Sequence, residues 1–475
     1  MKKLFWAFWL LLTLAVGGYF LYITLMAADK SLLLIGGVSH GHYQIEMACS
    51  ACHSDAFGGG EMIQNACVNC HQEELKQAHD SHPKKKFNDP RNADLLANID
   101  VTQCVTCHTE HKPEQTHAMG VTLPEDFCYE CHKDIGSQRP SHKDLKFDSC
   151  ASAGCHNYHD NRALYEKFLV KNSGGDWLQA IVTLPPANHA RLQGDRHPWS
   201  NALPSPSLTA TLDQEQQTLH PQATTEWLAS AHGQAGISCS GCHVSVDQRN
   251  TDVAGQWLDK PGLNECKTCH QQEAAGFLAG KHGVRLAVSL PAMQPVLSAM
   301  EFKESTKHEQ LGCTSCHGAH SFDTQKATFS ACVSCHDDQH SRAFIESPHG
   351  QLTSAALNGN KPWENAVTCA TCHMPRLFDE KTSANDMSDN NYGTKVDSNK
   401  QLGDSASKVV KVSVEHNQNA TLRPNEKMIR PVCMRCHSLE FSLDALASPD
   451  LINNNFNGPP SVHVPAIDWA LQRAK

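Results

Sequence analysis

Cysteine and histidine recur along this chain of 475 residues in one fixed spacing. Ten times, two cysteines separated by two residues are followed directly by a histidine, and an eleventh copy is stretched to four intervening residues. The eleven copies account for all 22 cysteines of the chain. The cysteine pairs are Cys49 and Cys52, Cys67 and Cys70, Cys104 and Cys107, Cys128 and Cys131, Cys150 and Cys155, Cys239 and Cys242, Cys266 and Cys269, Cys313 and Cys316, Cys332 and Cys335, Cys369 and Cys372, and Cys433 and Cys436.

This spacing is the attachment signature of c-type haem. The two thiols bond covalently to the haem, and the adjacent histidine lies under the iron as its proximal ligand. Zinc knuckles or disulfides would also use cysteine pairs, but neither requires a histidine after the second cysteine, and they stay open chiefly for the longer Cys150–Cys155 loop. We therefore expect eleven covalently attached haem c groups. The expected proximal ligands are His53, His71, His108, His132, His156, His243, His270, His317, His336, His373 and His437.

Nineteen further histidines lie outside the motifs. A low-spin haem with two histidine ligands needs one of them each, whereas any single one can also be a surface or hydrogen-bonded residue. Methionine is the main rival ligand and raises the potential, but with 11 methionines against 19 histidines we expect two-histidine ligation and low potentials. The distal candidates are His40, His42, His79, His82, His111, His117, His142, His159, His232, His282, His308, His320, His340, His349 and His416, with His463 further from the motifs.

An apolar run from Leu4 to Met26 precedes all of these motifs. Its 23 residues are long enough to cross a bilayer, and Lys2 and Lys3 before it predict a cytoplasmic N-terminus. The alternative is a cleaved signal peptide, for which Ala27 and Ala28 offer small residues. Both interpretations of residues 1–28 export the chain, and we expect a single-pass inner-membrane protein with its bulk in the periplasm.

The motifs fall into a dense group of five and a looser group of six. This grouping predicts a pentahaem domain at 29–171, a linker at 172–223 that is rich in Pro, Asn, Gln, Ser and Thr, and a hexahaem domain at 224–475. So many haems leave little room for a side-chain core, so we expect a mostly α and irregular, haem-packed fold with very little sheet. Short helices are expected at 73–79, 161–171, 224–232, 271–281, 339–346 and 466–475.

The second group of motifs resembles the superfamily of octahaem hydroxylamine oxidoreductases and pentahaem nitrite reductases. The resemblance rests on phrases between 224 and 440, such as WLASAHG from Trp227, CTSCHGAHSF from Cys313 and FIESPHG from Phe344. It implies distal roles for five of the candidate histidines, which are His232, His282, His320, His349 and His416.

The resemblance also places any open haem at Cys313 and Cys316, with His340 as a weak catalytic candidate and His308 nearby. The chain departs from the superfamily because no tyrosine follows His437 and because Gln339 stands where an aspartate is expected beside His340. These departures argue against hydroxylamine oxidation. The first group of motifs is similar to class III multihaem cytochromes c, and its position after a single helix is similar to that in membrane-anchored quinol dehydrogenases.

Two functions remain open at this level, besides a filament-forming extracellular cytochrome, which the membrane anchor disfavours. The formal net charge of −10 argues against nucleic-acid binding. Haems at this density lie within tunnelling distance of one another, which predicts an electron carrier in anaerobic respiration between a membrane quinol-oxidising or dehydrogenase donor and a periplasmic acceptor. The alternative is an oxidoreductase that acts on a small nitrogen or sulfur compound (nitrite, hydroxylamine or tetrathionate) in the second domain. The oligomeric state is not predicted.

Overall fold

The fold is known from a computed structural model that divides into two compact units. Unit 1 comprises Met1–Lys133 with Val288–Leu290, and unit 2 comprises Asp134–Ala287 with Pro291–Lys475. The structure describes residues 2–27, 29–54, 59–78, 82, 84–117, 120–150, 155–160, 164–178, 206–245, 257–298, 300–379 and 411–474. The domain boundaries expected from motif spacing stay a prediction, and the fifth motif falls within unit 2.

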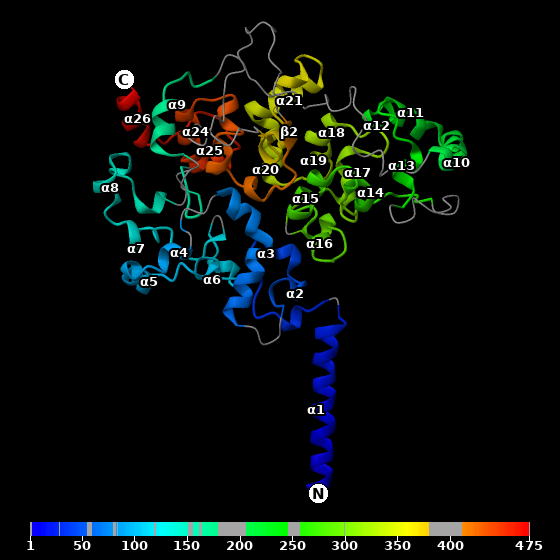
Figure 1. Cartoon of the computed structure of the whole chain (residues 1–475), viewed down its shortest axis with the longest axis horizontal. Helices are drawn as coiled ribbons and strands as arrows, with labels where there is room; N and C mark the ends of the chain where they lie inside the picture. Colours follow the sequence, from blue (N-terminus) through cyan, green and yellow to red (C-terminus); the bar gives the residue numbers. More distant parts are fainter. Residues whose placement is uncertain are drawn as a thin grey trace. The chain divides into compact units, whose positions relative to one another are not determined.

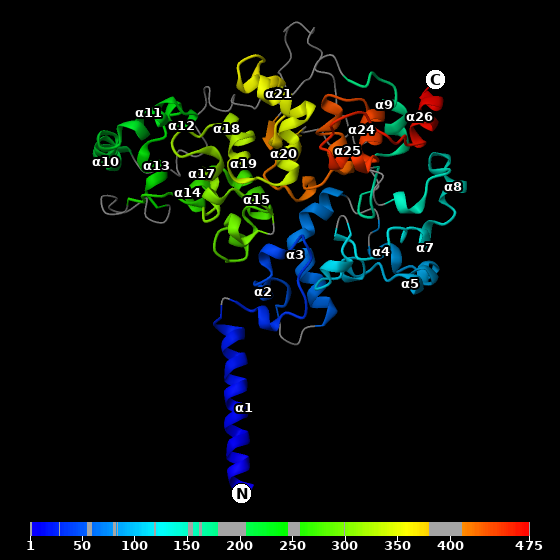
Figure 2. The same ribbon diagram turned by 180° about the vertical axis from the view of Figure 1, so that it is seen from behind.

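Unit 1 begins with the long helix α1 (Lys2–Leu25) and continues with short helices joined by irregular chain. Helix α1 is long and apolar enough to cross a membrane, and almost all of its side chains are exposed. In both views no other described helix of this unit packs along it (Figures 1 and 2). The remaining helices are α2 (Cys49–Cys52), α3 (Gly60–Ala78), α4 (Lys84–Phe87), α5 (Ala93–Asn98), α6 (Cys104–Cys107) and α7 (Tyr129–His132).

Unit 2 is also built from short helices, with one small sheet among its described residues. Strands β1 (Arg376–Asp379) and β2 (Lys411–Val414) pair antiparallel, with Arg376 opposite Val414. The helices are α8 (Ile135–Gln138), α9 (Glu166–Asn172), α10 (Pro206–Leu219), α11 (Pro221–Ala229), α12 (Ala231–Gln234), α13 (Cys239–His243), α14 (Leu263–Lys267), α15 (Gln271–Ala279), α16 (Val284–Ala287), α17 (Cys313–His317), α18 (Thr324–Thr328), α19 (Ser330–Cys335), α20 (Gln339–Glu346), α21 (Pro348–Leu357), α22 (Cys369–His373), α23 (Glu426–Ile429), α24 (Leu439–Leu446), α25 (Pro449–Asn453) and α26 (Ala466–Ala474). The expected fold, mostly α and irregular with very little sheet, is confirmed.

A conventional apolar core is found where α9, α24 and α26 meet in unit 2 (Figures 1 and 2). Helix α24 contributes Leu439, Leu443 and Leu446, whose spacing of four and three residues puts them on one helix face. Leu443 and Ile467 of α26 are both fully buried. This cluster fixes the C-terminal end of the chain against the segment that follows the fifth motif.

Helix α10 lies within the stretch 172–223 that was expected to be an irregular linker. Its Asp213 is buried and accepts hydrogen bonds from the backbone N–H and the hydroxyl of Ser240 in α13. Polar contacts of this kind leave no apolar periodicity in the sequence, which explains why the helix was not expected. The part of this stretch between 179 and 205 lies outside the described residues.

Candidate haem-iron sites

Five of the ten regular cysteine motifs form single helical turns. Helices α2, α6, α13, α17 and α22 each begin at the first cysteine of a motif. In a helical turn the residues i, i+3 and i+4 share one face. Both thiols and the imidazole of a motif are therefore presented on the same side, as covalent attachment to a haem edge and ligation of its iron require.

Among the residues that the structure describes, ten motif histidines each face a second histidine across a gap of similar width. The ring centroids of each pair are 5.8 to 6.4 Å apart. The pairs, with the motif histidine first, are His71–His42, His53–His111, His132–His82, His156–His142, His270–His232, His243–His320, His336–His282, His317–His416, His373–His340 and His437–His349.

This gap has the width that one iron ion needs. A metal-bound imidazole nitrogen lies about 2.0 Å from its metal and about 1.1 Å from its own ring centroid, so two rings on opposite sides of one ion have centroids about 6 Å apart. Two imidazoles packed directly against each other would lie closer. The residues present therefore fit a haem iron between each pair of histidines.

The same order of pairing occurs twice along the chain. In each group of motifs, the first motif histidine faces a histidine three residues beyond the third motif histidine, and the second faces one that stands seven residues before the first cysteine. The fourth faces a histidine between the second and third motifs, and the fifth faces one between the fourth and fifth. For four of the first five motifs, the facing histidine therefore stands at the same relative position in both groups.

Backbone carbonyls hold the Nδ1 atoms of several histidines at these sites. This arrangement fixes the ring and leaves Nε2 to bind iron, as is usual for metal-binding histidines. In unit 2, His373 Nδ1 lies 2.8 Å from the carbonyl oxygen of Thr421, and His243 Nδ1 lies 2.6 Å from that of Leu258. Further pairs are His108 with Gly120 at 3.0 Å, His111 with Gly36 at 2.9 Å, His416 with Val414 at 3.0 Å and His437 with Trp177 at 3.3 Å.

Two facing histidines adopt a backbone conformation that non-glycine residues rarely use. His111 has φ 62° and His320 has φ 65°. They occupy equivalent places in the repeated pairing, opposite the first motif histidine of each group. Backbone of this kind persists where the surroundings require it and clusters at functional sites. The shared conformation therefore supports a common role for both residues.

Burial favours the neutral form of three facing histidines. It lowers the pKa of His282 and that of His349 to about 4 in each case, and it lowers the pKa of His232 as well. A neutral imidazole is the form that ligates a metal. These side chains are thus ready to bind iron near neutral pH.

The second motif of the first group differs because both of its imidazoles contact carboxylates. His42 Nδ1 lies 2.7 Å from Glu110 Oε1, and His71 Nδ1 lies 2.9 Å from Glu74 Oε2. Burial alone would raise the pKa of Glu110, but hydrogen bonds from His42 and Ser39 lower it to about 2. Glu110 is therefore a carboxylate at any ordinary pH.

Cysteines of successive motifs also lie side by side. The thiols of Cys67 and Cys104 are close enough to hydrogen-bond, and this contact raises the pKa of Cys67 and lowers that of Cys104. The pairs Cys266/Cys313 and Cys332/Cys369 show the same relationship. Since each of these sulfurs belongs to an attachment motif, the attachment edges of neighbouring motifs meet at these places.

A third motif approaches the Cys266/Cys313 contact through Cys242. This cysteine is half-buried and lies in α13, on the single turn that also holds Cys239 and His243. The pKa of the Cys266 thiol is raised first by its hydrogen bond with Cys313, next by burial, and further by the nearby thiol of Cys242. Sulfurs of three successive motifs therefore gather here. Haem attachment at Cys242 stays a prediction, as it does at the other motif cysteines.

Several candidate histidines are placed elsewhere. His40 stacks on Tyr43, while His117 and His308 are exposed. His159 lies against Tyr158. His463 bonds Asp444 through Nδ1 at 2.9 Å and approaches Asp468 through Nε2 at 3.3 Å, so both of its nitrogens are engaged by carboxylates. His79 lies outside the described residues.

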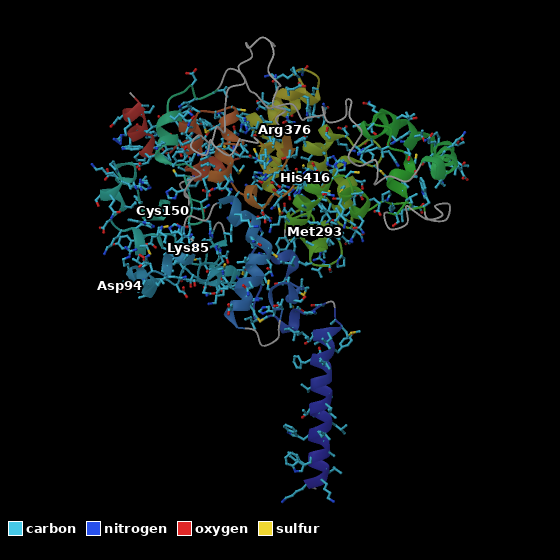
Figure 3. All side chains as sticks on the ribbon, viewed as in Figure 1. Lys85, Asp94, Cys150, Met293, Arg376 and His416 are labelled. Carbon is cyan, nitrogen blue, oxygen red and sulfur yellow. The ribbon has the colours of Figure 1, made fainter. Side chains whose placement is uncertain are left out.

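The weak catalytic candidate His340 lies opposite His373, whereas the motif histidine His317 faces His416. His416 stands two residues after β2, and its place is labelled in Figure 3. The resemblance pointed instead to His340 or His308 above His317. His416 lies about a hundred residues after His317 in the sequence, so the spacing around the motif could not predict this pair.

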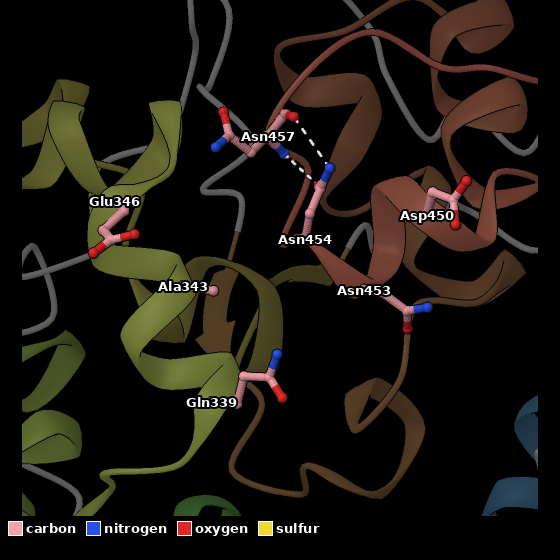
Figure 4. A pocket seen from close by; sticks show the side chains of 7 residues that line it. All are labelled: Gln339, Ala343, Glu346, Asp450, Asn453, Asn454 and Asn457. Carbon is pink, nitrogen blue, oxygen red and sulfur yellow. Dashed lines mark hydrogen bonds between the residues drawn. The ribbon is translucent and has the colours of Figure 1, made fainter.

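A polar cavity of about 380 Å³ lies beside His340, between α20 and α25 (Figure 4). Gln339, Glu346 and Asp450 line it together with three asparagines, and Asn455 donates a hydrogen bond to the backbone oxygen of His340. Its walls are mostly amides, and within the described part of the chain no motif cysteine or facing histidine lines it.

The chain shows limited similarity to known multihaem proteins. The family model for cytochrome c3 matches residues 41–133 and 305–385, one segment from each group of motifs. The chain is 28% identical over 165 residues to the multiheme cytochrome MtrA of Shewanella baltica, which is 30% of this chain and 46% of that protein. It is 26% identical over 68 residues to the cytochrome c nitrite reductase subunit NrfA of Nitratidesulfovibrio vulgaris, which is 13% of each. The matches thus span less than half the length of these relatives, and no solved structure matches the chain significantly.

Proposed function

This chain is a multihaem c-type cytochrome, and we propose that it carries electrons between a membrane quinol-oxidising or dehydrogenase donor and a periplasmic acceptor. We further propose that it holds eleven haems, one for each motif. The covalent links come from the 22 cysteines, and the iron ligands come from the motif histidines and the histidines that face them. Bound haem c supplies reversible one-electron oxidation and reduction at its iron.

The observation that carries this proposal is the pairing of the motif histidines in the second group. All six motif histidines between 239 and 437 face another histidine at 5.8 to 6.4 Å. A substrate-binding haem needs one open face. A carrier instead benefits from two fixed ligands, because they exclude water and small molecules from the iron.

The arrangement of the motifs favours electron transfer between them. Thiols from successive motifs lie side by side at Cys266/Cys313 and at Cys332/Cys369. This supports short edge-to-edge electron-transfer paths between the haems attached there. His282 and His349 are half-buried, which limits the contact of their imidazoles with solvent. The chain's residues therefore position, enclose and connect the redox centres, and no acid–base group is needed for this task.

Helix α1 supports the proposed location. It has 24 residues, is apolar and exposed, and stands at the N-terminus. We propose that it is an uncleaved anchor, which holds the bulk of the chain at the periplasmic face of the inner membrane. Cleavage after Ala28 would release the same domains, so the mature N-terminus decides between anchor and signal peptide.

The second candidate function is reduction of a small nitrogen or sulfur compound. The similarity to the nitrite reductase subunit NrfA and the polar cavity beside His340 favour it. Such an enzyme would require one iron of the second group to lose or lack its facing histidine.

Electron paramagnetic resonance of the oxidised full-length protein separates the two functions. A carrier should show low-spin ferric haem only, and added nitrite or hydroxylamine should leave the spectrum unchanged. A high-spin ferric signal that shifts with nitrite would reject the pure carrier and support the enzyme. Sequencing of the mature N-terminus from the membrane fraction tests the anchor, since a chain beginning near Asp29 would contradict it.

A further inference from the structure

The two groups of motifs contain one pair of equivalent iron sites with different surroundings. In the first group, the second motif pairs His71 with His42. In the second group, the second motif pairs His270 with His232. Both facing histidines stand seven residues before the first cysteine of their group, so the two sites can be compared position by position.

Both imidazoles of the first site are bonded to carboxylates. Glu110 Oε1 lies 2.7 Å from His42 Nδ1, and the Glu110 side chain is itself held by the backbone N–H and the hydroxyl of Ser39 at 2.7 and 2.8 Å. On the opposite side, Glu74 Oε2 lies 2.9 Å from His71 Nδ1. Ser39 thus fixes one carboxylate in position, and one turn of α3 fixes the other.

The equivalent groups of the second site are weaker or missing. Glu273 stands three residues after His270, as Glu74 does after His71, but its carboxylate lies 4.0 Å from His270 Nδ1. Among the described residues, the buried Nδ1 atom of His232 has no hydrogen-bond partner. The two sites therefore share their histidines and differ in the groups behind them.

A carboxylate behind an axial imidazole changes the iron that the imidazole binds. It accepts the Nδ1 proton in a charge-assisted hydrogen bond and makes the ring a stronger electron donor. A stronger donor stabilises ferric iron more than ferrous iron, which lowers the reduction potential. Hydrogen bonds to axial ligands are among the ways in which a protein sets haem potentials.

We propose that Glu110 and Glu74 hold the haem attached at Cys67 and Cys70 at a lower reduction potential than its counterpart at Cys266 and Cys269. This inference rests on the two-histidine ligation proposed above. In this arrangement the two carboxylates act as positioning residues for the axial ligands. The haem between His42 and His71 is then reduced later than its counterpart and releases its electron more readily.

The test is a potentiometric titration of the full-length haem-loaded protein, followed by absorbance and electron paramagnetic resonance. Glu110→Gln and Glu74→Gln keep a hydrogen-bond acceptor and remove the charge. Each substitution should raise the reduction potential of one haem. A change of about tenfold in its ferric–ferrous equilibrium is the low end for loss of such a partner. For one electron this corresponds to about 59 mV. Glu273→Gln is the matched control and should shift its component much less.

Equal shifts in Glu110→Gln and Glu273→Gln, or no shift in either, would overturn the inference. His42→Met identifies the component and tests the ligation separately. It should replace one low-spin two-histidine signal with a methionine–histidine one while the haem count stays constant. An unchanged spectrum in His42→Met would refute the ligation itself, whereas a changed spectrum with unshifted Glu110→Gln would refute only the role of the carboxylates.

Discussion

The imidazole rings of His340 and His373 face each other with their centroids 5.9 Å apart. His340 is the histidine that resemblance singled out for a catalytic role, and it lies beside the polar cavity of unit 2. In the proposed ligation His340 would close the iron held by His373, and its removal would open that iron.

His340→Ala should therefore convert one low-spin haem into a high-spin one. Without the facing imidazole, the iron at His373 keeps an open position that water or an added ligand can occupy. Electron paramagnetic resonance should show roughly one high-spin haem per chain, and cyanide should return it to low spin. His308→Ala is the control, because His308 is exposed and should leave every signal unchanged. High-spin haem already present in the unmutated protein would contradict the prediction.

The purified protein should carry eleven haems on its 52.2 kDa chain, counted by intact mass and by the alkaline pyridine assay. The stretched fifth motif is the informative one. Replacement of both Cys150 and Cys155 by alanine should lower the count by one haem and leave the other attachments in place. A count of ten in the unmutated protein, unchanged in this variant, would show that the fifth motif binds no haem.

Leu443→Ala should destabilise unit 2 by about 2 to 5 kcal/mol, because it removes buried methyl groups and leaves a cavity among α9, α24 and α26. The change should appear as a lower midpoint in denaturant unfolding. Leu357→Ala alters a half-exposed leucine of α21 and should stay within about 0.5 kcal/mol of the parent. Similar losses in both variants would mean that the cluster around Leu443 does not act as a core.

The contacts of His463 should make stability depend on pH. Hydrogen bonding to Asp444, and next to Asp468, raises the pKa of His463 in the folded state. The stabilisation is fully present below the unfolded pKa of about 6.5 and is lost as pH rises through the raised native value. His463 is partly exposed, so less than about 1 kcal/mol is expected. His463→Gln should flatten unfolding midpoints measured across this range, and an unchanged pH profile would contradict the assignment.

The sequence predicted the attachment chemistry and the fold class because both are local. Two thiols and an imidazole within five residues specify a haem motif, and an apolar run specifies α1. The pairing of histidines was not predictable, because facing residues are separated by 14 to 99 positions with no fixed spacing. The role of Glu110 was equally hidden, since its partner His42 lies 68 positions earlier.

The repeated order of pairing was visible only after the rings were placed in space. His111 and His320 each stand three residues after a motif histidine, yet each faces a different motif. Proximity in sequence therefore misleads here, because each motif helix ends at or just before its motif histidine, and His111 and His320 follow it in left-handed backbone. The buried Asp213–Ser240 contact likewise gave α10 a tertiary reason to form that its polar sequence does not display.

The histidine pairs of unit 2 should hold the chain together after proteolytic cleavage. Each haem, once attached and ligated, closes a loop between its motif and its facing histidine. The loops from His232 to His270, His243 to His320, His282 to His336, His317 to His416 and His349 to His437 overlap in succession. One proteolytic nick anywhere between His232 and His437 falls inside at least one of them, so the two fragments stay tethered until an iron–histidine bond opens in every loop that spans the nick.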